Sequence, residues 1–171
     1  KDESEPFYPF YGQATIDNGI ISYNQLTKDV LNNSYGKPTI LIHSNNQNIV
    51  YLETPFYLKD GHGATSVLQC EGLNIFNQKF IIASIDNVIK RKYSYNNKAT
   101  KIELKNTIIS LPVKNGSLDF DFMERIVVEI EMERILKLEK YLSEIGLNNH
   151  HLSLMEKKTL EDFEYDKFLL N

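Results

Sequence analysis

The residues that could perform catalysis are few in this sequence, and they are widely spaced. The chain contains four histidines, one cysteine and 23 aspartate and glutamate residues. His150 and His151 are adjacent, whereas two metal ligands on one helix face are separated by three or four positions. His62 lies between two glycines without a second ligand at a metal-like spacing. Cys70 follows an apolar stretch and is interpreted as a small buried side chain.

The motifs of common catalytic sites are absent from the sequence as well. It contains no GxSxG, HExxH or Walker pattern and no glycine-rich loop of the kind that binds S-adenosylmethionine after a strand. A nuclease centre of the PD…(D/E)xK type needs clustered carboxylates with a lysine, and Asp86, Glu103 and Lys105 do not form that pattern. We therefore expect a chain that is not an enzyme and that needs no metal or cofactor.

The charged residues are distributed unevenly along the chain, whose net charge is −4. Residues 79–105 contain seven lysines and arginines against two acidic residues, and residues 119–145 contain eight acidic residues against four basic ones. A basic segment followed by an acidic one predicts two surfaces with different partners. Solvated faces combined with the codon bias of an AT-rich genome would produce the same pattern, so charge alone leaves both interpretations open.

Length and composition are those of a soluble protein. A chain of 171 residues, 42% apolar and 25% charged, can bury the core of one medium domain. No apolar run approaches the roughly 18 residues of a membrane span, and the first residues do not resemble a signal peptide. The chain starts without methionine, as a piece cut from a longer protein would. A single cysteine excludes an internal disulfide, and we expect a cytoplasmic location without membrane contact.

Residues 6–113 consist of short apolar runs separated by turn residues, which predicts a β-rich domain. Asn18-Gly19 predicts a hairpin turn. Strands are expected at Thr39–His43 and Ile49–Leu52, and a further strand is expected after the glycine-containing turn that begins at Lys59. Apolar residues at helical spacing predict a helix over 74–91, and residues 98–113 are expected to form one or two strands.

A long helix is predicted directly after the turn at Asn115-Gly116. Asp119 or Asp121 caps its first turn, and Gly146 ends it. An early group of apolar residues can pack on the preceding domain. A later group has the 3,4 spacing of a coiled coil, interrupted by Glu131, and contains Val128, Ile135, Leu138, Leu142 and Ile145. A helix folded back on its own domain would also be amphipathic, and this alternative remains open.

Four segments, taken in order, resemble the specificity (S) subunits of type I restriction–modification systems and the matching domains of type IIG and IIB systems. They are PFYPFYGQATIDNGIISY, KDGHGATSVLQCEGLN, KRKYSYNNKATKIELKNTIISLPV and NGSLDFDFMERIVVEIE. Together they cover most of residues 7–145. The tail EDFEYDKFLL is similar to the sequence motif with which the next recognition domain begins in such subunits.

This resemblance implies a mixed α+β, β-rich target recognition domain at 1–118, which reads one half of a bipartite site in double-stranded DNA. It implies a conserved spacer helix at 119–146, which pairs with another helix as a coiled coil, and a linker with the start of a following recognition segment at 147–171. The implied partners are methyltransferase (M) subunits, restriction (R) subunits and a second helix of the same kind.

If the resemblance holds, basic residues position the domain on phosphates while polar side chains on loops read base edges. The residues expected to contact DNA are Tyr11, Gln13, Asn45, Asn46, Lys59, His62, Thr65, Ser66, Lys90, Arg91, Lys92, Tyr93, Tyr95, Asn96 and Lys98. The alternative function is a β-rich protein- or carbohydrate-binding module whose helix oligomerises. Salt dependence separates the two, because only DNA binding weakens steeply as salt rises.

Overall fold

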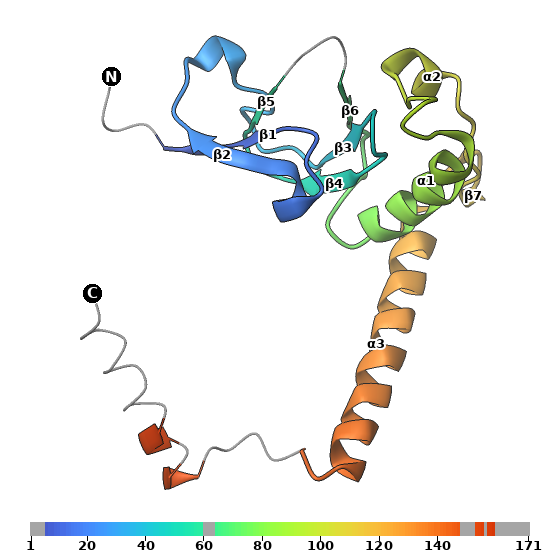
Figure 1. The fold of residues 1–171 in the computed structure, drawn as a ribbon. Coiled ribbons are helices and arrows are strands. Elements are labelled where there is room, and N and C mark those ends of the chain that lie inside the picture. The colour runs from blue at the N-terminus through green and yellow to red at the C-terminus, as the bar shows by residue number, and fades with distance from the viewer. Residues whose placement is uncertain (1–5, 60–63, 148–152, 156, 160–171) are drawn as a thin grey trace. The chain divides into compact units, whose positions relative to one another are not determined.

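A computed structural model describes residues 6–59, 64–147, 153–155 and 157–159. Small sheets and helices are mixed in this part of the chain (Figure 1), which confirms the predicted α+β class. The chain divides into two compact units, Lys1–Val128 and Glu129–Asn171. Within the described ranges, no helix has both the length and the apolar character that crossing a membrane requires.

The first unit contains two three-stranded sheets and a small two-stranded ribbon. The first sheet has the order β2 (Ile20–Asn24), β1 (Tyr8–Tyr11), β5 (Tyr57–Leu58), with β1 antiparallel to β2 and parallel to β5. The second sheet is antiparallel and has the order β4 (Ile49–Leu52), β3 (Thr39–His43), β6 (Thr65–Leu68). The ribbon pairs β7 (Val113–Lys114) with β8 (Ser117–Leu118). Short 3₁₀ turns lie at Ile16–Gly19 and Lys28–Val30.

The central strand β3 is buried along its whole length because each of its two faces is covered. Ile40 and Ile42 belong to the cluster that includes the inner residues of helix α1 (Gln78–Lys92). Leu41 points to the opposite face and joins the cluster that holds the first sheet against the second. The unit is therefore layered, with the first sheet, the second sheet and the helices following one another from left to right in Figure 1.

The strands predicted at Thr39–His43 and Ile49–Leu52 are confirmed, with the same bounds. The expected strand after the glycine-containing turn is β6, although residues 60–63 of that turn lie outside the described residues. The hairpin predicted at Asn18-Gly19 is confirmed only in part: β2 follows the turn, but its antiparallel partner is β1, and residues 12–19 form a longer connection in place of a two-residue turn. Asp17, Asn18 and Gly19 all have positive φ, so the left-handed turn starts one residue before the predicted pair.

The strands expected between 98 and 113 were mostly wrong. Residues Lys101–Lys105 form a short helix, α2, and only Val113 and Lys114 belong to a strand. The Thr100 hydroxyl accepts a hydrogen bond from the Glu103 N–H at 3.3 Å and caps the first turn of α2. Leu104 packs against the core cluster beneath α1. Side-chain capping and packing therefore decide the local structure of this segment.

Helix α3 (Phe120–Glu144) begins and ends at the predicted signals. The turn at Asn115-Gly116 joins β7 to β8, with positive φ at both residues. Asp119 then caps the helix, since its carboxylate accepts from the Phe122 N–H at 2.9 Å. At the other end, the Leu147 N–H donates to the Leu142 carbonyl at 2.8 Å, and Gly146 adopts a positive φ of 74°. These are the features of a Schellman C-cap.

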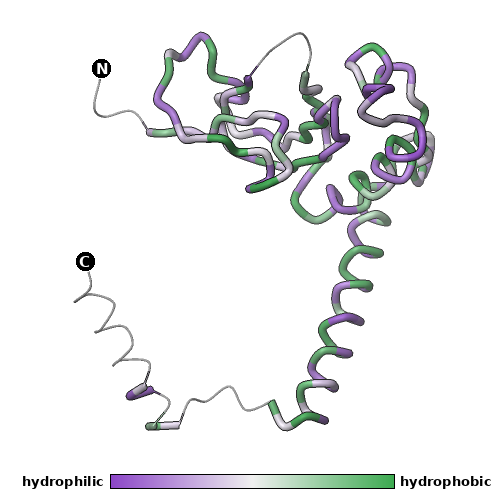
Figure 2. The backbone as a smooth tube through the Cα atoms, viewed as in Figure 1, coloured by the Kyte–Doolittle hydropathy of each residue, from purple (hydrophilic) through white to green (hydrophobic). Residues whose placement is uncertain are grey.

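Burial divides α3 into two parts. Met123 and Val127 are buried, and Met123 belongs to the core cluster of the first unit. From Glu129 to Glu144 every residue is exposed except Leu142, which is partly buried. Hydrophobic and hydrophilic residues alternate along α3 in Figure 2. The predicted pairing residues Val128, Ile135, Leu138 and Ile145 are thus accessible, with exposed fractions between 37% and 56%.

Candidate nucleic-acid interface

Three of the segments expected to contact DNA meet at one end of the second sheet. The Gln13 side chain connects them, because its Nε2 donates to the Ala64 carbonyl at 2.9 Å and its Oε1 accepts from the Asn45 N–H at 3.1 Å. The Asn46 side chain donates to the Gln13 carbonyl at 2.9 Å. We call Gln13, Ser44, Asn45, Asn46 and Ala64 the polar junction.

A fourth segment, the turn over 94–97, is attached to the polar junction by main-chain hydrogen bonds. Ser44 donates its N–H to the Ala64 carbonyl at 2.9 Å and accepts from the Ala99 N–H at 3.0 Å. The turn itself is closed by reciprocal hydrogen bonds between Ser94 and Asn97. Polar residues that are far apart in the sequence therefore form one continuous surface.

His43 lies directly beneath the polar junction, at the end of β3. Its ring is fully buried, and Nδ1 is 3.0 Å from the Thr65 hydroxyl. Nε2 has no hydrogen-bond partner among the described residues, and a side chain at Gly19 would approach it within 3.1 Å. Burial lowers the pKa of His43 below its ordinary value, because the interior disfavours the charged ring. His43 is therefore a neutral packing residue that supports Thr65 from below.

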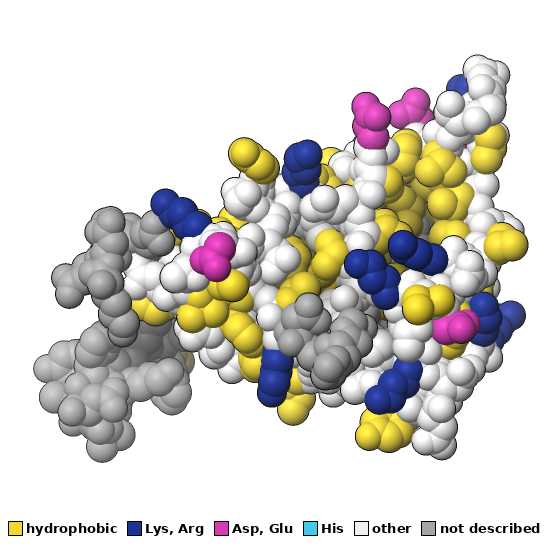
Figure 3. Space-filling view, turned by 90° about the horizontal axis from the view of Figure 1, so that it is seen from above, with side chains coloured by type: hydrophobic (Ala, Val, Ile, Leu, Met, Phe, Trp, Pro, Cys, Tyr) yellow, Lys and Arg dark blue, Asp and Glu magenta, His cyan; other side chains and the backbone are white. Residues whose placement is uncertain are grey.

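Basic side chains lie next to the polar junction, on α1, α2 and the turn between them. We call this set the basic surface: Lys90, Arg91, Lys92, Lys98, Lys101 and Lys105, all exposed. In Figure 3, dark blue side chains gather among hydrophobic ones on the right, the side on which α1 and α2 lie in Figure 1. Tyr95 is 73% exposed, and the Lys98 ammonium lies 5.7 Å from its ring centroid. Such an exposed ring can stack on a base or a sugar.

Members of the basic surface differ in how far their charge is already compensated. Lys90 forms an ion pair with Asp86 at 2.8 Å. Among the described residues, Lys92 contacts neutral groups, the Thr107 hydroxyl at 3.3 Å and the Tyr93 ring at 5.2 Å from its centroid. Arg91 has no ion pair with any residue that the structure describes. Arg91 and Lys92 are therefore better placed than Lys90 to neutralise phosphates.

Three residues expected to contact DNA are buried instead. Tyr11 packs edge to face on Phe56, with ring centroids 5.9 Å apart. Tyr93 belongs to the core beneath α1, and its hydroxyl bonds to Thr107 at 2.7 Å. Ser66 faces the core side of the second sheet. Tyr11 and Tyr93 are enclosed by packing and do not belong to the contact surface, whereas Ser66 is buried at the wall of a groove. His62 lies outside the described residues.

The remaining candidates are accessible. Lys59 is exposed and follows β5, where its N–H donates to the Tyr11 carbonyl at 2.9 Å. Asn96 is exposed in the turn, and Thr65 is partly buried at the start of β6. Lys101 and Lys105 were not among the predicted contact residues, and their segment was expected to be a strand. The signal was present in Thr100 and Glu103, which have the spacing of a capping box and predict a helix that begins there.

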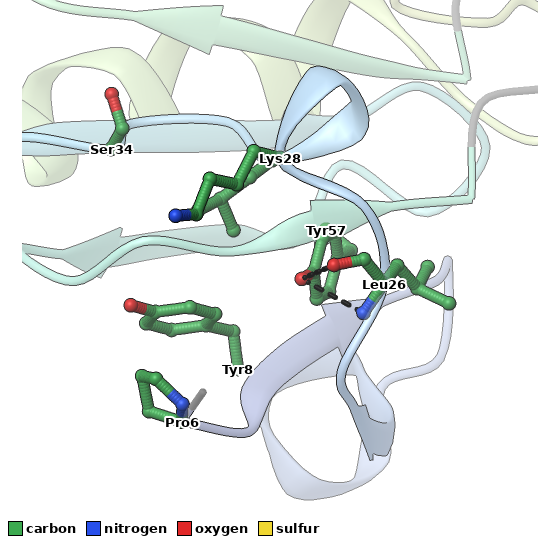
Figure 4. A pocket seen from close by; sticks show the side chains of 7 residues that line it. Pro6, Tyr8, Leu26, Lys28, Ser34 and Tyr57 are labelled. Atoms are coloured by element: carbon green, nitrogen blue, oxygen red, sulfur yellow. Dashed lines mark hydrogen bonds between the residues drawn. The ribbon is translucent and has the colours of Figure 1, made fainter. Parts of the chain in front are cut away.

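A separate cavity of about 470 Å³ lies beside the first sheet (Figure 4). Tyr8, Tyr57, Pro6 and Lys28 line it, and the rings of Tyr8 and Tyr57 meet edge to face with centroids 6.2 Å apart. The Tyr57 hydroxyl is bonded to the main chain of Leu26 at 3.0 Å. The cavity therefore offers the partly buried Tyr8 ring and the Lys28 side chain, with Tyr57 only 2% exposed.

Within the described residues, no three His, Cys, Asp or Glu side chains are close enough to hold a metal ion. Comparison with protein-family models, curated proteins and solved structures produced no match to this chain. A functional proposal therefore rests on the geometry of the surface together with the sequence resemblance.

Proposed function

We propose that this chain is a DNA-sequence-reading module of a restriction–modification system, a specificity subunit or half of one. The polar junction reads base edges in one half of a bipartite site, and the basic surface binds the flanking phosphates. The chain acts without catalysing a reaction of its own, and a DNA methyltransferase subunit supplies the chemistry.

The observation that carries this proposal is the convergence of polar loops beside lysine and arginine side chains. Gln13, Asn45 and Asn46 come from different parts of the sequence and share hydrogen bonds, as a rigid reading surface requires. The Gln13 and Asn46 amides already form hydrogen bonds within the junction, and each has a second N–H that can donate to a base. The Asn45 side chain has no partner among the described residues and offers both a donor and an acceptor. The adjacent basic surface supplies the affinity that does not depend on sequence.

Helix α3 has the role of a docking and spacing element in this proposal. Its 25 residues correspond to about 37 Å at a rise of 1.5 Å per residue. Val128, Ile135, Leu138, Leu142 and Ile145 repeat at 3,4 spacing and pair with a second helix or with methyltransferase subunits. Restriction subunits would join the same assembly.

Methylation mapping tests the proposal. The chain is expressed together with the methyltransferase encoded beside it, and methylated bases are located across the host DNA. We expect methylation at one defined bipartite sequence, and its loss when this chain is omitted. Methylation that is unchanged without the chain would refute the proposal.

The Tyr8 and Tyr57 cavity favours one competing function, a protein- or carbohydrate-binding module (Figure 4). Aromatic faces with few charges suit a sugar ring or an apolar side chain. The competing function predicts glycan or peptide binding that is nearly indifferent to salt. It also predicts that Tyr8→Ala abolishes binding whereas substitutions in the basic surface do not.

A further inference from the structure

A groove of about 290 Å³ lies between strand β6 and helix α2, at the side of the basic surface. This volume is close to the lower end of small-ligand sites. Its apolar wall contains Ile42, which is 3% exposed, together with the partly buried Leu68 and Leu104. The wall belongs to the main core, so it is held rigidly and can receive a flat apolar surface.

Ser66 supplies an unused polar group at this wall. Its side chain is nine-tenths buried, and Oγ has no hydrogen-bond partner among the described residues. A buried hydroxyl without a partner is costly, and most buried polar groups in folded proteins are satisfied. Rotation about the Cα–Cβ bond can turn the hydroxyl of Ser66, which lines the groove, toward a ligand bound there.

The free edge of β6 supplies a main-chain donor and acceptor. β6 is at the end of its sheet. The Ser44 N–H bonds to the Ala64 carbonyl, so these two residues form a hydrogen-bonded pair and the next pair, His43 and Thr65, is a non-hydrogen-bonded one. By the antiparallel alternation, the N–H and C=O groups of Val67 then point away from β3. Val67 borders the groove and is 45% exposed. A neighbouring donor and acceptor match the hydrogen-bonding edge of a nucleobase.

Positive charge lies on the α2 side of the groove. Lys101 and Lys105 are separated by four positions, so they share one face of the helix, and both are exposed. Neither forms an ion pair with a residue in the described ranges. Two ammonium groups beside an apolar wall suit a ligand with a planar ring and an adjoining phosphate.

We propose that this groove binds one unstacked nucleotide of the DNA, with its base against Ile42 and Leu104 and its phosphate between Lys101 and Lys105. The inference rests on the proposed function, because it extends the DNA surface to α2. An acidic peptide could pair with the β6 edge and with the lysines, but it would leave the apolar wall of Ile42 and Leu104 without a planar partner, so the nucleotide fits more of the groove.

The test compares two duplexes that differ in a single extrahelical adenosine. The extrahelical base is already unstacked, so binding does not require the free energy of unstacking a base. The intact chain is therefore expected to bind the bulged duplex at least about fivefold more tightly than the paired one. Ser66→Ala removes only the hydroxyl, which already lacks a partner, so it is expected to leave folding intact. It weakens binding of the bulged duplex by about fivefold, because the hydroxyl no longer contacts the bound nucleotide.

The possible outcomes separate the two proposals. If the intact chain binds bulged and paired DNA with equal affinity and with steep salt dependence, nucleotide binding in the groove is refuted, whereas the proposed DNA-reading function is retained. Absence of salt-dependent binding to either duplex overturns both. If a glutamate-rich peptide displaces the bulged duplex but not the paired duplex, the groove binds a protein partner. That result also refutes the proposal that the groove binds a nucleotide.

Discussion

Replacing Arg91 and Lys92 together by alanine is expected to weaken binding to every DNA duplex by a similar factor. Both side chains are exposed at the C-terminal end of α1, and neither has an ion pair among the described residues. They therefore contribute charge without being tied to one base sequence. Loss of the two charges reduces phosphate neutralisation and leaves the polar junction unchanged.

The magnitude follows from counterion release. Each phosphate contact contributes about 0.9 to the slope of log affinity against log salt. At about 0.1 M salt, loss of two contacts corresponds to roughly 60-fold weaker binding, or about 2.4 kcal/mol. The salt slope should fall by about 1.8 in the double variant.

Fluorescence anisotropy with labelled duplexes of different sequence measures both quantities over a range of salt. Lys137→Ala with Lys140→Ala is the matched control, because it removes the same charge from α3, where both lysines already face glutamates at 2.6 and 3.8 Å. Thermal unfolding verifies that the variants are folded. If the Arg91 and Lys92 variant keeps the affinity and slope of the unmodified chain, the basic surface does not contact DNA.

Three further predictions concern the helix, the core and the buried histidine. Leu138→Asp with Leu142→Asp should abolish self-association through α3, and light scattering that detects an unchanged mass would contradict helix pairing. Met123→Ala should lower the free energy of unfolding by about 2–5 kcal/mol in urea titrations, because Met123 is fully buried where α3 joins the first unit. A loss below about 1 kcal/mol would show that Met123 is not a core contact. His43 has a lowered pKa in the folded chain, so as pH falls its ring takes up a proton in the unfolded chain before it does so in the folded one. The free energy of unfolding should therefore fall as pH drops below about 6.5, by up to about 1.4 kcal/mol per pH unit. His43→Gln should reduce that pH slope, and an identical slope in the variant would show that His43 does not titrate on unfolding.

The strands and caps that could be predicted were those determined by neighbouring residues. Thr39–His43 and Ile49–Leu52 are apolar runs bounded by polar residues, and Asp119 and Gly146 act locally at the two ends of α3. Helix α1 starts at Gln78, four residues later than predicted. Asn74 explains the delay, since its side chain accepts from the N–H groups of Phe76 and Asn77 at 2.9 Å and holds a turn ahead of the helix.

The candidate surface was less predictable because burial depends on contacts between distant segments. Tyr93 and Tyr95 are two residues apart in the same basic stretch, yet one is 5% exposed and the other 73%. The difference arises from α2 and the residues that follow it, because the Tyr93 hydroxyl bonds to the Glu103 carbonyl and the Thr107 hydroxyl. The segment that forms α2 was itself expected to be a strand. A five-residue helix spans too few turns for apolar periodicity to reveal it.

Part of the polar junction is held by main-chain atoms alone, beside the bonds of the Gln13 and Asn46 side chains. The N–H and C=O groups of Ser44, the C=O of Ala64 and the N–H of Ala99 hold three segments together, and almost any amino acid supplies those groups. Side chains that take no part in these bonds, such as that of Asn45, can therefore be exchanged during evolution while the framework beneath them persists. Under the proposed function, a few such surface substitutions would change the base sequence that is read without altering the core.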